Sequence, residues 1–306
     1  MLKRSIGQTS WQASAVALGI MRMASLDVSE AEKVVQSALA SGIDFIDSAD
    51  MYGNGQSEVV FGEVLKRGSV KREELFIQSK GGIVSGQRFD FSKKHLLASV
   101  DGILQRMGIE YLDSYLLHRP DPLMEPDEIA ETFDILQTSG KVRHFGVSNF
   151  HPEQYKLVQE AVHQKLVINQ LQFSIMHTGM VDAGLHVNML DSRSIDHDGG
   201  ILEFSRRKGV TIQAWSPFQY GFFEGVFIDN EQFPELNMCM QTLAEKYNVT
   251  KNAIATAWIL RHPAQMQVIL GTMNPERIAD SAAGSEITLT KQEWYDVYFA
   301  AGNDLP

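Results

Sequence analysis

The sequence contains a single cysteine, Cys239, among 306 residues. One cysteine excludes an internal disulfide and any zinc site built from several thiolates. It is also typical of a protein from a reducing compartment. The nine histidines are scattered, and no His-x-His pair or carboxylate cluster follows a candidate strand. A metal-dependent hydrolase is therefore a weak alternative, and we expect no metal site.

Long hydrophobic runs and excess positive charge are also lacking. No run approaches the roughly 18 apolar residues of a membrane helix, and Met1–Ser5 leads into a polar segment rather than the apolar part of a signal peptide. We therefore expect a cytoplasmic protein without a membrane anchor. The formal net charge of -11 argues against nucleic acid as a partner. It leaves room for a phosphorylated cofactor, because that ligand needs only a local positive site.

Short apolar runs alternate with helical patterns along the whole chain. Gly42, Gly108 and Gly140 follow helical patterns, as expected for residues that end helices; two such patterns are 29–39 and 92–107. This alternation predicts the α/β class, and eight strands with crossovers predict a (β/α)8 TIM barrel, here one domain over 1–306. The eight candidate strands are Ala15–Ile20, Phe45–Ser48, Leu75–Ser79, Leu112–His118, Val142–Val147, Val167–Gln172, Val210–Trp215 and Gln267–Leu270.

Three segments fall outside this count. Residues 1–13 predict a short N-terminal hairpin that turns at Gly7–Gln8. The connections 174–199 and 217–233 are unusually long, and long loops in compact domains are usually lids or binding loops. The second is rich in aromatic residues that can wall an apolar pocket, namely Phe218, Tyr220, Phe222, Phe223 and Phe227.

Four polar residues, Asp47, Tyr52, Lys80 and His118, stand at or just after the ends of successive candidate strands. In a barrel of parallel strands these ends meet at one mouth, where such barrels carry their active sites. A buried lysine needs a carboxylate, which Asp47 can supply. The lysine can then lower the pKa of the Tyr52 phenol and make it a general acid for a carbonyl oxygen, with His118 as a second donor. Singly each residue has an ordinary structural explanation, but together they predict a catalytic site.

Longer motifs around these residues strongly resemble the aldo-keto reductase family. They are Phe45-Ile-Asp-Ser-Ala-Asp-Met-Tyr-Gly53, Lys80, Leu117-His-Arg-Pro120 and Gly140-Lys-Val-Arg-His-Phe-Gly-Val-Ser-Asn-Phe150. The resemblance covers nearly the whole chain. It implies a (β/α)8 barrel that reduces small aldehydes or ketones with NADP(H), using Asp47, Tyr52, Lys80 and His118.

The resemblance also implies a set of cofactor-binding residues. Ser148, Asn149 and Gln170 would hold the nicotinamide carboxamide, Trp215 would stack on the ring, and Asp280 and Ser281 would contact adenine. The segment that crosses the pyrophosphate would begin at Ser216, Pro217 and Phe218. The adenosine-phosphate site would comprise Gly271, Thr272, Met273, Asn274 and Arg277, where a helix N-terminus and a forked arginine favour phosphate.

Two departures from the family pattern lie where the phosphates of the nicotinamide cofactor would bind. Many members carry a lysine where this chain has Gly271, so one charge usually offered to the 2′-phosphate is missing. We expect NADP(H) to be the preferred cofactor, while NAD(H) stays possible because of this missing charge. Where the family often shows Gly-Thr, this chain has Met21-Arg22, and we expect these residues to contact the cofactor. The dinucleotide motif G-x-G-x-x-G is absent, in agreement with a barrel.

Two functions stay open: a carbonyl reductase, and a nucleotide-sensing regulatory protein with slow or no turnover. The intact catalytic set favours the reductase. The substrate is not fixed, although Met21, Met51, Met176, Phe222 and Phe223 indicate an adaptable apolar pocket. We expect a monomer by default.

Overall fold

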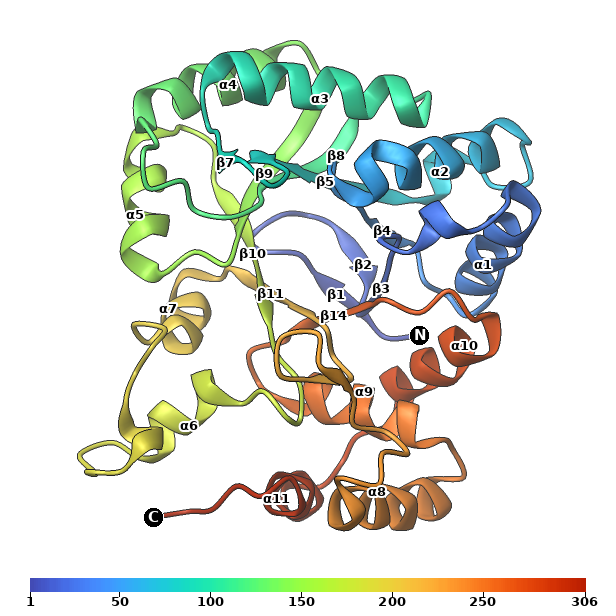
Figure 1. Ribbon diagram of the computed structural model, residues 1–306, viewed down its shortest axis with the longest axis vertical. Coiled ribbons are helices and arrows are strands. Elements are labelled where there is room, and N and C mark those ends of the chain that lie inside the picture. The colour runs from blue at the N-terminus through green and yellow to red at the C-terminus, as the bar shows by residue number, and fades with distance from the viewer.

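The computed structural model describes residues 1–306, and eight parallel strands in it form a closed barrel in the order β10-β11-β14-β3-β4-β5-β8-β9 (Figure 1). The predicted (β/α)8 barrel is confirmed, and all eight predicted strands are present, with most ends shifted by only one or two residues. The strands are β3 (Val16–Gly19), β4 (Phe45–Asp47), β5 (Phe76–Gly81), β8 (Leu112–Leu117), β9 (Val142–Ser148), β10 (Leu166–Gln172), β11 (Thr211–Trp215) and β14 (Gln267–Leu270).

Helices surround the barrel and cover its outer face (Figure 1). Seven of them connect successive barrel strands: α1 (Val28–Ala40), α2 (Gln56–Lys66), α3 (Lys93–Met107), α4 (Pro126–Thr138), α5 (Pro152–Ala161), α7 (Ile201–Lys208) and α9 (Lys251–Arg261). An eighth, α10 (Pro275–Ala283), follows the last strand, β14. Three more are α6 (Gly179–Leu185), α8 (Pro234–Tyr247) and α11 (Lys291–Ala300). No helix is long and apolar enough to cross a membrane.

The two helices predicted from periodicity are confirmed, and their ends have clear causes. The Asp27 carboxylate caps α1 by accepting from the backbone N–H groups of Ser29 and Glu30. Ser92 caps α3, which ends at Gly108 in the left-handed conformation with φ of 64°. Capping satisfies N–H groups that lack a partner within the helix.

The N-terminal hairpin closes one end of the barrel. Strands β1 (Lys3–Ser5) and β2 (Gln12–Ser14) pair antiparallel, and Gly7 in the turn has φ of 54°. Ile6 of this hairpin is buried in a small apolar cluster inside the barrel with Ala13, Ala17, Phe45, Leu116, Val167, Ile168 and Ile269. The predicted hairpin is therefore confirmed, and it leaves only the opposite, C-terminal end open.

The two long connections contain regular structure that the sequence did not reveal. Residues 174–199 include α6 and a 3-10 turn (Ser192–Ser194), held by buried Met180 and Val181. Residues 217–233 include a small hairpin of β12 (Gln219–Tyr220) and β13 (Gly225–Val226). A second small hairpin, β6 (Ile83–Val84) with β7 (Arg88–Phe89), follows β5. All three lie after the C-terminal ends of barrel strands, beside the open mouth.

Candidate active site

A buried ion pair joins the ends of β4 and β5. The Lys80 ammonium donates to both carboxylate oxygens of Asp47 at 2.7 and 2.8 Å, and to the Ser48 carbonyl at 2.7 Å. Lys80 is fully buried and Asp47 is 2% exposed. Burial alone would lower the pKa of Lys80, but the Asp47 charge and Tyr52 outweigh it, and the pKa is raised. The lysine therefore stays charged inside the protein, as the sequence predicted.

A layer of glutamines inside the barrel supports Asp47 from below. Gln78 and Gln170 donate to Oδ1 of Asp47 at 2.7 and 2.9 Å. Both also donate to the Oε1 atom of Gln213, at 2.8 and 3.0 Å, and Gln213 in turn donates to Gln267 at 2.7 Å. Buried polar groups are costly unless hydrogen bonded. This chain of amides satisfies them and orients the Asp47 carboxylate.

Tyr52 lies beside this ion pair at the start of a 3-10 turn (Tyr52–Gly55). The Lys80 ammonium is 5.3 Å from the centre of the Tyr52 ring. Burial raises the pKa of Tyr52 above its ordinary value, and the nearby Lys80 charge opposes this rise without cancelling it. We expected a net lowering; instead the free phenol stays protonated, and Lys80 stabilises the phenolate that proton donation would create.

His118 faces Tyr52 from the end of β8. The two rings meet edge to face, with centroids 6.0 Å apart and planes at 83°. Burial, reinforced by the charges of Lys80 and Arg119, lowers the pKa of His118 well below its usual range. The imidazole is thus neutral, and its buried Nδ1 has no hydrogen-bond partner. A proton on Nε2 avoids a buried unpaired N–H and makes Nε2 the donor toward the mouth.

Ser148, Asn149, Gln170 and Trp215 gather at the ends of β9, β10 and β11, as expected. Trp215 donates from Nε1 to Asn149 Oδ1 at 3.1 Å, and Asn149 donates to Ser148 Oγ at 2.8 Å. Ser148 donates to the backbone carbonyl of Gln170 at 3.0 Å. Asn149 adopts φ of 60°, a left-handed conformation that asparagine tolerates better than most residues. The side-chain oxygen of Gln170 accepts no hydrogen bond from the protein.

The connection after β11 forms an aromatic wall beside Trp215. The Phe223 ring stacks near it at 6.1 Å, and the Phe222 ring meets it edge-on at 6.4 Å. Both phenylalanines are exposed, at 48% and 66%. Ser216 has φ of 51° and donates to the Gln219 side chain, while Phe218 packs against the core. Exposed aromatic rings at a mouth are typical of a ligand-binding surface.

The residues expected at the cofactor phosphates lie on the other side of the mouth. Arg22 donates from Nη1 to the Gly271 carbonyl at 2.9 Å, so its guanidinium occupies the space beside a residue without a side chain. Arg277 stands in the first turn of α10 without a carboxylate partner, and Asn274 caps that helix by accepting from the Arg277 backbone N–H at 3.0 Å. Thr272 accepts from the Asn274 backbone N–H at 3.2 Å. This region suits a phosphate.

A cavity of about 540 Å³ adjoins the same helix. Its lining includes Asn274, Arg277 and Asp280 from α10, together with Lys251, whose ammonium pairs with Asp229. Ser281, however, does not face this cavity with its hydroxyl. That side chain is fully buried and donates to the Arg277 carbonyl at 2.7 Å, so its contact with an adenine stays a prediction.

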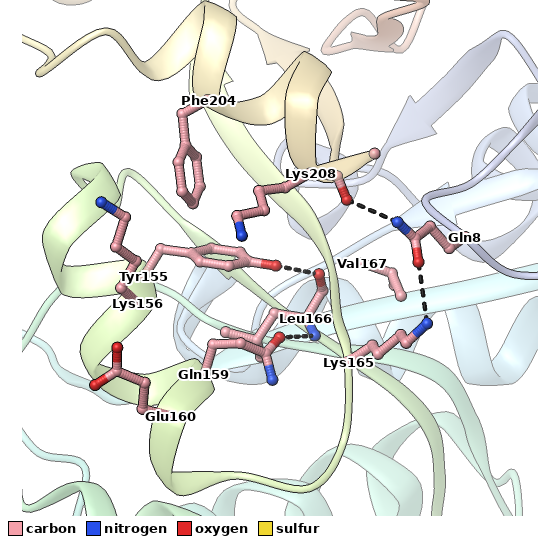
Figure 2. A pocket seen from close by; sticks show the side chains of 11 residues that line it. Gln8, Tyr155, Lys156, Gln159, Glu160, Lys165, Leu166, Val167, Phe204 and Lys208 are labelled. Carbon is pink, nitrogen blue, oxygen red and sulfur yellow. Dashed lines mark hydrogen bonds between the residues drawn. The ribbon is translucent and has the colours of Figure 1, made fainter.

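A second cavity, of about 380 Å³, lies at the opposite end of the barrel between α5 and α7 (Figure 2). Its polar groups largely bond to one another: Tyr155 donates to the Leu166 carbonyl at 2.6 Å, and Gln8 bridges Lys165 and the Lys208 carbonyl at 3.0 and 2.9 Å. None of the predicted catalytic residues lines it. The C-terminal mouth is therefore the candidate active site.

Sequence reasoning missed three residues at or below this site. Gln78 and Gln213 are polar side chains within apolar strands, and only the barrel geometry shows that they point inward under Asp47. Arg119 follows His118 directly, and its guanidinium carbon lies 5.8 Å from the centre of the Trp215 ring. Its place next to His118, within the motif Leu117-His-Arg-Pro120, was the signal available.

Comparisons with known proteins agree with this geometry. Residues 15–298 match the model of the aldo/keto reductase family. The chain is 33% identical to a 6-dehydroglucose reductase of Agrobacterium fabrum, over 87% of this chain and 86% of that protein. It is 32% identical to the oxidoreductase YdhF of Escherichia coli, over 94% of both chains. A crystallised thermostable aldo-keto reductase, solved with the inhibitor epalrestat, shares the fold with a TM-score of 0.79 at 24% identity, covering 98% of this chain and all of that one.

Proposed function

Because this chain belongs to the aldo/keto reductase family of oxidoreductases, we propose that it reduces an aldehyde or ketone with NADPH and that Tyr52 donates the proton. The observation that carries this proposal is the buried Lys80–Asp47 pair, which places a permanent cation 5.3 Å from the Tyr52 ring. A phenol that is protonated in the free enzyme and has its anion stabilised nearby is suited to give up a proton during the reaction.

The bound nicotinamide would supply a hydride to the carbonyl carbon. The protein's own residues then act on the oxygen, which gains negative charge. Tyr52 transfers its proton to this oxygen, and neutral His118 donates a hydrogen bond to it from Nε2 and orients the carbonyl. Lys80 stabilises the resulting phenolate, and Asp47 keeps Lys80 charged and in place.

Cofactor binding would involve groups that the protein leaves free. The side-chain oxygen of Gln170 would accept from the carboxamide NH2, with Ser148 and Asn149 beside it, and Trp215 would stack on the ring. Arg277 and the first turn of α10 would bind the adenosine phosphate. Arg22 would supply a charge beside Gly271, where the family often has a lysine. Further contacts would come from Met21, Ser216, Pro217, Phe218, Thr272, Met273, Asn274 and Asp280.

The direct test is to mix the purified protein with NADPH or NADH and follow the loss of absorbance with a panel of aldehydes and ketones. The panel should include an oxidised sugar, since one relative is named 6-dehydroglucose reductase. We expect turnover with NADPH and weaker use of NADH. Tight cofactor binding without turnover on any carbonyl would instead support a nucleotide-sensing role.

A further inference from the structure

Arg119, at the mouth of the barrel, is a half-buried arginine without a hydrogen bond or an ion pair to the protein. Guanidinium groups that lose water normally recover hydrogen bonds from carbonyl or carboxylate oxygens. The other half-buried arginines follow this rule: Arg4, Arg72, Arg106, Arg193 and Arg261 all donate to such oxygens. The N–H groups of Arg119 therefore have no hydrogen-bond acceptor within the protein and are available to a ligand.

The surroundings of Arg119 leave those N–H groups available. Its guanidinium carbon lies 5.8 Å from the centre of the Trp215 ring, within the range of a cation–π contact. Such a contact gives the N–H groups no oxygen acceptor, so they stay available for a forked hydrogen-bond acceptor. Burial lowers the pKa of Arg119, but an arginine remains charged at neutral pH.

No carboxylate of the protein pairs with this charge, and the one group that acts on Arg119 electrostatically is Tyr52. Asp47 is the carboxylate of the catalytic group, and it is bonded on both oxygens to Lys80. His118 is neutral, because its pKa is lowered by burial and by the charges of Lys80 and Arg119. Arg119 is thus a positive charge near Tyr52 and His118 that has no ion-pair partner, in a protein whose net charge is -11.

The position of β8 in the barrel separates Arg119 from the proposed adenosine-phosphate site at Gly271 and Arg277. In the closed order, β14 is followed by β3, β4, β5 and then β8, so β14 and β8 lie on opposite sides of the eight-stranded ring. Arg22 and Arg277 stand beside the end of β14 and in α10 after it. Arg119 instead adjoins His118 and Trp215. Its partner is therefore to be sought in the substrate rather than in the adenosine phosphate.

We infer that Arg119 binds a carboxylate carried by the carbonyl substrate, so that the enzyme prefers oxo acids over uncharged carbonyl compounds of the same length. A carboxylate matches the forked edge of the guanidinium with two parallel hydrogen bonds. This inference rests on the proposed reductase function and specifies its substrate class.

The test compares 4-oxobutanoate with butanal, two four-carbon aldehydes that differ by the carboxylate. The wild-type protein should favour 4-oxobutanoate in kcat/KM by about tenfold or more. Arg119→Met, which keeps much of the side-chain volume, should abolish this preference mainly through a higher KM for 4-oxobutanoate. Arg119→Lys should retain part of it. Arg206→Met, an exposed arginine on α7, is the matched control and should leave the preference unchanged.

A binding measurement makes the outcome independent of turnover. Succinate, which cannot be reduced, should raise the melting temperature of the wild-type protein with cofactor present and should not do so for Arg119→Met. Turnover of butanal without an oxo-acid preference, or a preference that survives in Arg119→Met, would overturn the inference while leaving the reductase intact. A preference for uncharged polyhydroxy aldehydes that depends on Arg119 would also overturn the inference that Arg119 binds a substrate carboxylate. If neither aldehyde nor any other carbonyl is reduced, the reductase proposal fails, and succinate binding alone decides the role of Arg119.

Discussion

Gln170 donates its side-chain N–H groups to Asp47 and to the amide below it, while the oxygen of the same amide accepts nothing from the protein. The bond to Asp47 Oδ1 measures 2.9 Å, and Gln170 is 3% exposed. One rigid amide therefore connects the Lys80–Asp47 ion pair to the place proposed for the nicotinamide. Its orientation is not free to change, because a flipped amide would turn its oxygen toward the Asp47 carboxylate.

Replacement of Gln170 should therefore damage catalysis and cofactor binding together. In Gln170→Met, Asp47 loses one of its donors and the carboxamide loses its acceptor, and we expect a loss of about tenfold in both kcat and NADPH affinity. Stopped-flow turnover and a fluorescence titration with NADPH measure the two effects separately. Gln172→Met, two residues along the same strand, is the control, since Gln172 donates to the Gly221 carbonyl instead. A loss confined to stability would show that Gln170 only supports the barrel.

The Lys80–Asp47 pair should be as important for stability as for turnover. Lys80→Met leaves a buried carboxylate without its counter-charge, which costs about 3–5 kcal/mol in the free energy of unfolding. Adding Asp47→Asn removes that charge, so the double variant should be more stable than Lys80→Met although equally inactive. Urea unfolding followed by circular dichroism gives the comparison. A double variant less stable than Lys80→Met would contradict the claim that the unpaired Asp47 charge destabilises Lys80→Met.

The pKa shifts of Tyr52 and His118 predict how the reaction responds to pH. The pKa of His118 is lowered well below 6.5 and that of Tyr52 is raised above 10. Both residues thus keep the required protonation state through neutral pH, and kcat/KM should show no step near pH 6.5. The unfolded chain binds a proton at His118 more readily than the folded one does, so His118 makes stability fall as pH drops through 6.5. His118→Gln should weaken that fall, and an unchanged pH profile of stability would contradict the assignment.

Arg277 should discriminate between the two nicotinamide cofactors. It has no carboxylate partner in the first turn of α10, so it is free for a phosphate. Arg277→Met should weaken NADPH by about tenfold or more and leave NADH nearly unchanged. Fluorescence titration of both cofactors measures this, with Arg207→Met on the distant α7 as a control for a change in net charge. Equal weakening of both cofactors would show that Arg277 does not contact the 2′-phosphate.

The barrel and the gathering of Asp47, Tyr52, Lys80 and His118 at its mouth could be predicted from the sequence because their signals are local. Each strand is a short apolar run, and Asp47, Lys80 and His118 stand at or near strand ends, which parallel pairing brings to one mouth. The glutamines below Asp47 could not be predicted. Whether Gln78 or Gln213 points into the barrel or outward depends on strand register and tilt, which no single run of residues contains.

The structure also differs from the sequence expectations where packing between distant segments decides the outcome. Residues 174–199 are rich in polar residues and glycine and were expected to form a loop, but burial of Met180 and Val181 supports a helix there. Ser281 was placed in the cofactor site by its position in the family pattern. Its side chain is buried, because it lies on the face of α10 that packs inward with Ile278 and Ala282, and its contact with the cofactor stays a prediction.

The central claim is that Tyr52 supplies the proton, and the most direct test is Tyr52→Phe, which removes one oxygen and keeps the ring beside His118. The measurement is single-turnover oxidation of bound NADPH with a saturating aldehyde, alongside the dissociation constant for NADPH. We predict a fall in rate of at least about a hundredfold, because proton donation typically contributes that much, with nearly unchanged cofactor affinity. Turnover in Tyr52→Phe at the wild-type rate would contradict the mechanism.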